Sequence, residues 1–324
     1  MRAARWWAAL CCAAGLAAAS PAGLAQAQAS VPVPAQTPAT STSPRSAAAP
    51  ETRAAGFPLV VKDDRGVAHR FDLPPRRVIT LLPSLTETVA ALGAGPQLVG
   101  VDRFSTWPAD IERLPRLGGL DDARIEAIVA LKPDLVLAST SARSLDRLDA
   151  LGVRVLRLRS ESYADVRRTL DMLAQLLGTP EEGPRTWDRL QRELDAAARR
   201  VPASLRGRSV YFEIGGGPYA AGTTSFVGET LARLGLVNIV PPELGPFPKL
   251  NPEFVVKARP EVVMGVDREL DAMAVRPGWS SVPAIRLDRR CGYPTAQYDM
   301  LVRPSPRLGE AAERIADCLE RIAR

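Results

Sequence analysis

The chain has 324 residues, of which 46% are hydrophobic and 24% charged. This balance excludes disorder over the whole length and is sufficient for one large or two medium domains. The formal net charge of +6 comes without a block of lysines or arginines, so no nucleic-acid-binding face is expected. The single histidine, His69, excludes a histidine-rich metal site, and it excludes Ser-His-Asp or Cys-His catalysis in which it takes no part.

Residues 1–29 have the pattern of a cleaved secretory signal. Arg2 and Arg5 precede an apolar run, and small residues follow it at the Ala-x-Ala spacing of a cleavage site. The run, Trp6–Ala19, is shorter than the roughly 20 residues that span a bilayer, which disfavours a membrane anchor. Leu10, just before Cys11, disfavours lipid attachment at that cysteine. We therefore expect a periplasmic protein.

Residues 30–56 are rich in Ala, Pro, Ser and Thr, and this composition predicts a disordered linker. Beyond it, Leu59–Val61 and Val67–Phe71 predict the two arms of a β-hairpin. Gly66 supplies the positive φ that a tight turn requires. His69 lies in the second arm, where we expect it to face solvent or to cap the backbone rather than to bind a metal.

An internal repeat is the most informative feature of the sequence. The segment Glu126–Leu137 is echoed by Glu253–Met264, with Glu, Val, Pro and Val identical. Earlier in each half, Glu87–Gly93 is echoed by Glu229–Gly235. The order is the same in both halves, so two structurally related lobes are predicted.

Each copy predicts the same series of elements. A strand leads through a loop to a short helix that ends in glycine, and a second helix is stopped by proline before a continuous apolar strand. Uninterrupted apolar strands that alternate with helices indicate a parallel sheet buried on both faces. The residues are Val78–Leu82, Gly93, Pro133 and Leu135–Ala138 in the first copy, and Ser209–Ile214, Gly235, Pro260 and Val262–Met264 in the second.

Between the copies, Glu181–Arg200 has helical spacing, with Trp187, Leu190 and Leu194 on one face. We interpret it as one rigid helix of about 30 Å. The predicted fold is α/β, with two Rossmann-like lobes that have parallel sheets and are joined by one long backbone helix. A ligand is expected in the cleft between them. The predicted divisions are 1–29 signal, 30–56 linker, 57–178 N-terminal lobe, 179–204 connecting helix and 205–324 C-terminal lobe.

Two cysteines remain after removal of the signal, Cys291 and Cys318. An exported protein with two cysteines favours a disulfide, and only one pairing is possible. The alternative is a pair of buried thiols.

The segments Pro75–Glu87 and Ala130–Val136 resemble recurring strings of the helical-backbone class (class III) of periplasmic substrate-binding proteins. These proteins serve ABC importers for cobalamin, haem and ferric siderophores. The resemblance runs from about residue 57 to the C-terminus. It implies capture of a ligand and delivery to a membrane permease, with no catalytic residue, cofactor or resident metal, by a protein expected to be a monomer.

Within this class the chain is most similar to the cobalamin binders. The segment Val99–Pro108 resembles the one that places an aromatic residue at the cleft, which makes Trp107 the candidate. Phe247 stands where these proteins carry a second aromatic residue, and Asp299 with Arg303 matches a polar pair that faces the corrin. Tyr219 follows three glycines that would let the backbone approach a ligand. The predicted ligand-binding residues are Trp107, Tyr219, Phe247, Asp299 and Arg303.

The chain departs from the cobalamin pattern at two places. No aromatic residue stands around Leu117–Gly118, and Ser139 occupies a second expected aromatic position. A pocket poorer in aromatic residues leaves open a different corrinoid, weaker binding or another ligand.

Haem and ferric siderophores are the alternative ligands. The haem-binding relatives place an iron-ligating tyrosine in two loops that read Leu117–Leu120 and Gly245–Pro248 here, and neither contains tyrosine. Tyr219 and Tyr298 remain as substitutes. An exported hydrolase is a distant alternative, because no nucleophile motif, metal-ligand spacing or close carboxylate pair is visible. An adhesion or scaffold module is equally remote.

Glu126 and Glu253 resemble the class's two docking carboxylates, one on each lobe, which would meet arginines of the permease. Rim charges of this kind set encounter rate and register more than affinity. Each glutamate also suits the first turn of a helix, where a carboxylate complements the helix dipole. The two interpretations are compatible, and the recurrence at matched positions favours docking.

Overall fold

The computed structural model describes residues 56–324. The predicted signal at 1–29 and nearly all of the predicted linker lie outside the described residues. Within residues 56–324, no helix combines the length and the apolar character that crossing a bilayer demands.

The described chain begins with the predicted hairpin. Strands β1 (Leu59–Lys62) and β2 (Ala68–Phe71) pair antiparallel, and Gly66 has a φ of 86° in the turn. The expectation that His69 faces solvent was wrong. Its side chain is only 10% exposed, with Nε2 3.6 Å from Oδ2 of the buried Asp63.

The first sheet has four parallel strands in the order β4-β3-β5-β6. Short helices connect them, and α4 follows the last strand. Strand β3 ends at Thr80, earlier than predicted, and Pro83 begins α1, where its fixed φ suits the first position of a helix. The elements are β3 (Val78–Thr80), α1 (Pro83–Ala91), β4 (Leu98–Val101), α2 (Ile125–Ala130), β5 (Leu135–Ser139), α3 (Asp146–Ala150), β6 (Val155–Leu158) and α4 (Tyr163–Leu176).

The second sheet follows the order β11-β10-β7-β8, and β9 also pairs with β7. The pairs β7–β9, β7–β10 and β10–β11 are parallel, whereas the short β8 runs antiparallel to β7. The elements are β7 (Ser209–Ile214), β8 (Tyr219–Ala220), α6 (Phe226–Arg233), β9 (Val237–Asn238), α7 (Pro252–Ala258), β10 (Val262–Val266), α8 (Asp267–Met273), α9 (Pro283–Arg286), β11 (Arg290–Tyr293), α10 (Thr295–Leu301) and α11 (Leu308–Ile322).

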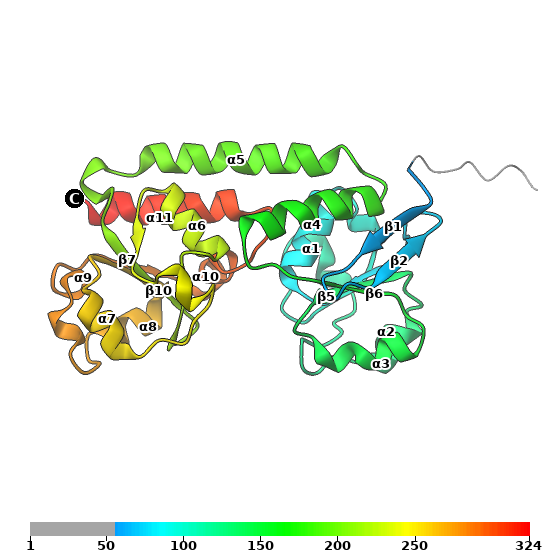
Figure 1. Ribbon diagram of the computed structural model, residues 1–324, viewed down its shortest axis with the longest axis horizontal. Helices are drawn as coiled ribbons and strands as arrows, with labels where there is room; N and C mark the ends of the chain where they lie inside the picture. The colour runs from blue at the N-terminus through cyan, green and yellow to red at the C-terminus, as the bar shows by residue number, and fades with distance from the viewer. Residues whose placement is uncertain (1–55) are drawn as a thin grey trace, which may run out of the picture. The chain divides into compact units, whose positions relative to one another are not determined.

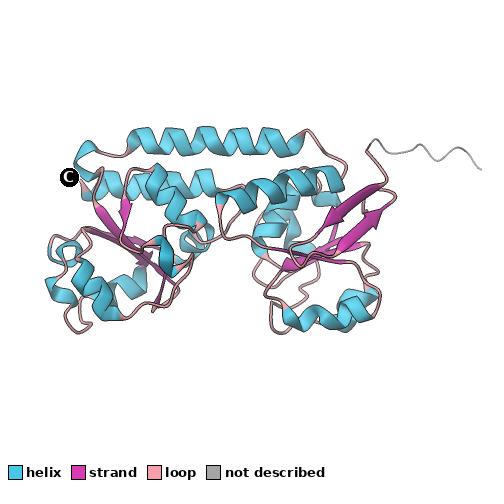
Figure 2. Ribbon diagram, viewed as in Figure 1, coloured by secondary structure: helices cyan, strands magenta, loops and turns pink. Residues whose placement is uncertain are grey.

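We call the first sheet with α1–α4 the first lobe, and the second sheet with α6–α11 the second lobe (Figure 2). The helix α5 (Glu182–Arg200) joins them and lies along α11 and α4 (Figure 1). The predicted fold class is confirmed, and the helix predicted from 181 to 200 is present within one residue. The predicted domain boundaries at 178 and 204 stay predictions.

Successive residues of the central strands point into different apolar clusters. In β3, Val78 faces a large cluster that also contains Leu190 and Leu194 of α5, whereas Ile79 faces a cluster confined to the first lobe. The second sheet repeats the pattern. Met264 of β10 joins the large cluster and Val263 a cluster of the second lobe. Burial on both faces explains the uninterrupted apolar strands, and the shared cluster packs both sheets against α5.

The repeat predicted from the sequence corresponds to structure. Gly93 and Gly235 follow α1 and α6 with φ of 74° and 82°, which is the predicted left-handed helix end. After α2 and α7, Lys132 and Arg259 take positive φ, at 46° and 51°, directly before the two repeat prolines. Equivalent residues of the two lobes therefore end the second helix of each copy in the same left-handed conformation.

Candidate functional site

Polar contacts join the two lobes next to the predicted site residue Arg303. Its Nη1 donates to Glu87 Oε1 of α1 at 2.9 Å, and Ser305 Oγ donates to Glu87 Oε2 at 2.6 Å. Glu87 and Ser305 are buried, and the side chain of Arg303 is 11% exposed. Arg303 is therefore held by the first lobe, although it belongs to the second.

Asp299 lies one helical turn before Arg303, and its Oδ2 is 3.6 Å from Arg303 Nη2. Its side chain is 47% exposed, so the carboxylate remains free to meet a ligand. The predicted pair is present as a pair, with the guanidinium recessed and the carboxylate at the surface.

The loop after β4 carries an aromatic residue that sequence reasoning did not single out. Phe104 is 54% exposed, and Arg303 Nη2 donates to its carbonyl oxygen at 3.2 Å. The guanidinium carbon of Arg103 stands 4.8 Å from the centre of the ring, within cation–π distance. Phe104 thus lies beside Arg303, at the contact between the lobes. The resemblance of Val99–Pro108 points to this loop, but the residue that it predicts there is Trp107.

Buried hydroxyls anchor this loop. Asp102 Oδ1 accepts from the backbone amide of Phe104 at 2.7 Å, and Asp102 Oδ2 accepts from Ser105 Oγ. Ser105 Oγ in turn pairs with Thr86 Oγ1 at 2.7 Å, which pairs with Thr80 Oγ1 at 2.7 Å. Burial raises the pKa of Asp102, against the opposing effect of its hydrogen bonds. The chain of hydrogen bonds fixes the backbone that presents Phe104.

Trp107 lies in a different environment. The guanidinium carbon of Arg307 is 5.0 Å from its ring centre, and the indole lines a pocket of about 340 Å³ together with Arg189 and Glu193 of α5 and Glu310 of α11. The indole is therefore half-buried beside the connecting helix.

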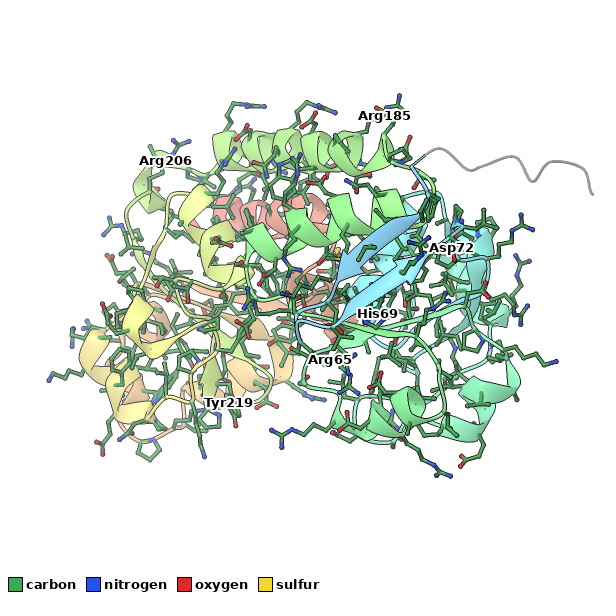
Figure 3. All side chains as sticks on the ribbon, turned by 45° about the vertical axis from the view of Figure 1, so that its right-hand side comes forward. Arg65, His69, Asp72, Arg185, Arg206 and Tyr219 are labelled. Atoms are coloured by element: carbon green, nitrogen blue, oxygen red, sulfur yellow. A yellow bond between two sulfur atoms is a disulfide. The ribbon has the colours of Figure 1, made fainter. Side chains whose placement is uncertain are left out.

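The second lobe contributes Tyr219 and Phe247. Tyr219 is 48% exposed at the start of β8, on the side of the lobe away from α5 (Figure 3). Phe247 is partly buried, with its ring centre 5.7 Å from that of Phe226. The backbone amide of Phe226 donates to Glu161 O of the first lobe at 2.7 Å. Phe247 therefore packs next to the contact between the lobes, and Tyr219 is the more accessible ring.

The glycine run before Tyr219 rests on a buried ion pair. Glu213 accepts from Arg276 through both carboxylate oxygens, at 2.6 and 2.9 Å, and from Tyr211 OH at 3.0 Å. A Cβ on Gly217 would lie 3.2 Å from Glu213 Oε2, so glycine lets the loop lie close to this carboxylate.

Tyr298, a possible iron ligand, already uses its hydroxyl. It donates to Glu213 O at 3.0 Å and accepts from Gly215 N at 2.8 Å, and the residue is 5% exposed. Burial raises the pKa of Tyr298 to about 12, which opposes formation of a phenolate ligand. Of the two substitutes for a haem-ligating tyrosine, Tyr219 is the accessible one.

Glu126 and Glu253 lie in the first turns of α2 and α7, at equivalent places of the two lobes. The side chain of Glu126 is 79% exposed, and its Oε1 is 3.3 Å from Arg147 Nη1. Glu253 is also exposed. Neither is buried in a structural role, and both remain accessible for a protein partner.

The predicted disulfide is present. Cys291 of β11 and Cys318 of α11 are bonded, with their Cα atoms 5.8 Å apart. The bond ties the edge strand of the second sheet to the helix that packs on α5.

Comparison with known proteins places this fold in a family. The family model described as "Periplasmic binding protein" matches residues 78–296. A cobalamin-binding protein of Halobacterium salinarum is 31% identical over 302 residues, which cover 86% of this chain and 80% of the relative. The chain therefore belongs to the periplasmic binding protein family, whose members bind substrates for ABC transport.

Two further relatives show which members of the family this chain resembles. A vitamin B12-binding protein of Salmonella typhimurium is 27% identical over 253 residues, covering 76% of this chain and 91% of the relative. The periplasmic heme-binding protein of Roseiflexus sp. RS-1 in its apo form is 27% identical, with a TM-score of 0.65, and the match covers 77% of this chain and 99% of that structure.

Proposed function

We propose that this protein binds a corrinoid, such as cobalamin, outside the cytoplasmic membrane and delivers it to the permease of an ABC importer. The observation that carries the proposal is the 31% identity, over 86% of the chain, to a protein named for cobalamin binding. The vitamin B12-binding relative supports the same ligand.

The residues near the contact between the lobes fit a large amphipathic ligand. Exposed aromatic rings, Phe104 on the first lobe and Tyr219 on the second, offer apolar faces for a macrocycle. The half-exposed carboxylate of Asp299 and the recessed guanidinium of Arg303 offer an acceptor and a donor for peripheral amide groups. Phe247 and Trp107 stay candidates for the walls of the same site.

Docking completes the proposed cycle. Glu126 and Glu253 would meet basic residues of the permease, with no chemical change to the ligand. We propose no cofactor or resident metal, and a monomer as the working form.

The test is calorimetric titration of the purified protein with cyanocobalamin, with hemin titrated in parallel and followed in the visible spectrum. One-to-one binding of cyanocobalamin at micromolar or tighter affinity is expected. Binding of hemin with a shifted Soret band and no heat from cyanocobalamin would overturn the corrinoid assignment. In that case Tyr219→Phe would test the accessible tyrosine as the iron ligand.

A further inference from the structure

The repeat contains two glutamates that neither ligand contact nor permease docking uses. Glu87 of α1 and Glu229 of α6 open the echoed segments that end at Gly93 and Gly235. Both side chains leave their own lobe and bind the other one. Equivalent residues of the two lobes therefore make reciprocal contacts.

Glu87 reaches from the first lobe to the segment between α10 and α11. It is 1% exposed, and each carboxylate oxygen accepts one hydrogen bond, from Arg303 Nη1 or from Ser305 Oγ. Arg303 Nη2 then bonds the carbonyl of Phe104. Through this guanidinium, Glu87 fixes the second lobe against the loop that presents an exposed aromatic ring.

Glu229 reaches from the second lobe to the start of α4 in the first. Its Oε2 accepts from the backbone amide of Tyr163 at 2.6 Å. Tyr163 is the first residue of α4, where an amide has no partner within the helix, and a carboxylate there is favoured by the helix dipole. The next residue, Thr230, adds a bond of 2.7 Å between its Oγ1 and Tyr163 OH.

We propose that Glu87 and Glu229 are a pair of positioning residues, one from each copy of the repeat, that fix the angle between the lobes and so preset the distance between the two ligand-contacting faces. A helix such as α5 holds the lobes together along one side, but a single helix leaves rotation about its own axis. Two side-chain contacts from opposite lobes, together with the backbone bond from Phe226 to Glu161, oppose that rotation. Charge-assisted hydrogen bonds in buried surroundings are strong enough to do so.

The first experiment uses the ligand-free protein and hydrogen exchange read by mass spectrometry. We expect Glu229→Gln to raise exchange roughly tenfold or more in peptides that contain Tyr163 and Phe226, because a charge-assisted bond is lost. We expect Glu87→Gln to do the same around Ser305 and Phe104. Each variant should also raise exchange at the other contact, since the two contacts share one angle.

Milder variants guard against loss of the fold. Tyr163→Phe removes the hydroxyl bond to Thr230, and Ser305→Ala removes the bond to Glu87 together with the one from the Arg307 amide. Both leave the two glutamates in place, so smaller increases at both contacts are expected. The matched control is Glu126→Gln, an exposed glutamate in a helix of the first lobe, which should leave both contacts unchanged. Increases confined to the altered contact in all four variants would overturn the proposal.

The second experiment rests on the proposed function. If the wild-type protein binds cyanocobalamin, Tyr163→Phe and Ser305→Ala should weaken binding at least threefold, mainly through faster release, although neither side chain is assigned to the ligand. Unchanged affinity in both variants would contradict the proposal that these contacts set the distance between the two ligand-contacting faces. Absence of cyanocobalamin binding by the wild type would count against the corrinoid proposal alone, because the exchange experiment does not involve the ligand.

Discussion

The carboxylate of Asp63 accepts the hydrogen bonds that fix the turn of the hairpin. It accepts from the backbone amides of Arg65, Val67 and Arg157 and from Arg65 Nε, at 2.9 to 3.3 Å. Burial raises the pKa of this carboxyl, but the hydrogen bonds outweigh that effect and hold the pKa below its usual range. The carboxylate form is the one that the fold requires.

We predict that Asp63→Asn lowers the free energy of unfolding by about 1 to 3 kcal/mol at neutral pH, because the charged acceptor is lost. The folded pKa lies below the unfolded one, so the contribution of Asp63 is fully present above the unfolded value near 3.8 and is lost as pH falls through the folded value. Urea unfolding at a series of pH values checks this. A difference between the two proteins that grows on acidification would contradict the assignment.

Phe104 and Trp107 lie in the same loop, and replacing each of them tests which one contacts the ligand. We predict that Phe104→Ala weakens cyanocobalamin binding about tenfold or more and costs more than Trp107→Ala, because Phe104 is exposed beside Arg303 whereas Trp107 is half-buried beside the connecting helix. Calorimetry on both variants, with thermal melting to check the fold, provides the measurement. The reverse order would return Trp107 to the centre of the site.

At the scale of elements, the regular parts could be predicted because apolar pattern and helix-ending residues act locally. The strands β7 and β10 and the helix α5 follow from runs and spacings in the sequence. The antiparallel β8 could not be foreseen, since two residues have no period and its pairing depends on the turn at Gly215–Pro218. The exposure of His69 and of Phe104 could not be foreseen for a related reason. Whether a side chain is covered depends on residues distant in sequence.

The disulfide is an element-scale device, since it bonds β11 to α11 across 27 residues of chain. We predict that Cys318→Ala lowers the free energy of unfolding by about 3 to 4 kcal/mol, from the entropy that closing a loop of this length removes from the unfolded chain. Guanidinium unfolding under oxidising conditions measures the loss. Dithiothreitol should bring the wild type close to the variant and leave the variant unchanged, and a gap that persists after reduction would show that packing at the cysteine is responsible.

At the scale of the whole molecule, the repeat distributes two tasks among equivalent glutamates. Glu126 and Glu253 point to solvent from the first turns of α2 and α7, whereas Glu87 and Glu229 join the lobes. The sequence alone pairs these residues but does not separate their tasks, because burial and cross-lobe contact exist only in the folded chain.

We predict that Glu126→Arg combined with Glu253→Arg abolishes uptake of labelled cyanocobalamin by cells that depend on this importer, and that each single change reduces uptake partially. Reversed charges at two rim positions would repel a basic permease surface and slow the encounter, with a larger effect at low ionic strength. Affinity for cyanocobalamin in the purified double variant should match the wild type, because neither glutamate is among the proposed ligand contacts.

Glu112→Arg and Glu243→Arg, at exposed positions of the first and second lobe, are the matched controls and should leave uptake unchanged. Equal losses in the control variants would show that the loss of uptake follows from the change in net charge and not from these two positions. Uptake at the wild-type rate in the double variant would show that the docking surface lies elsewhere.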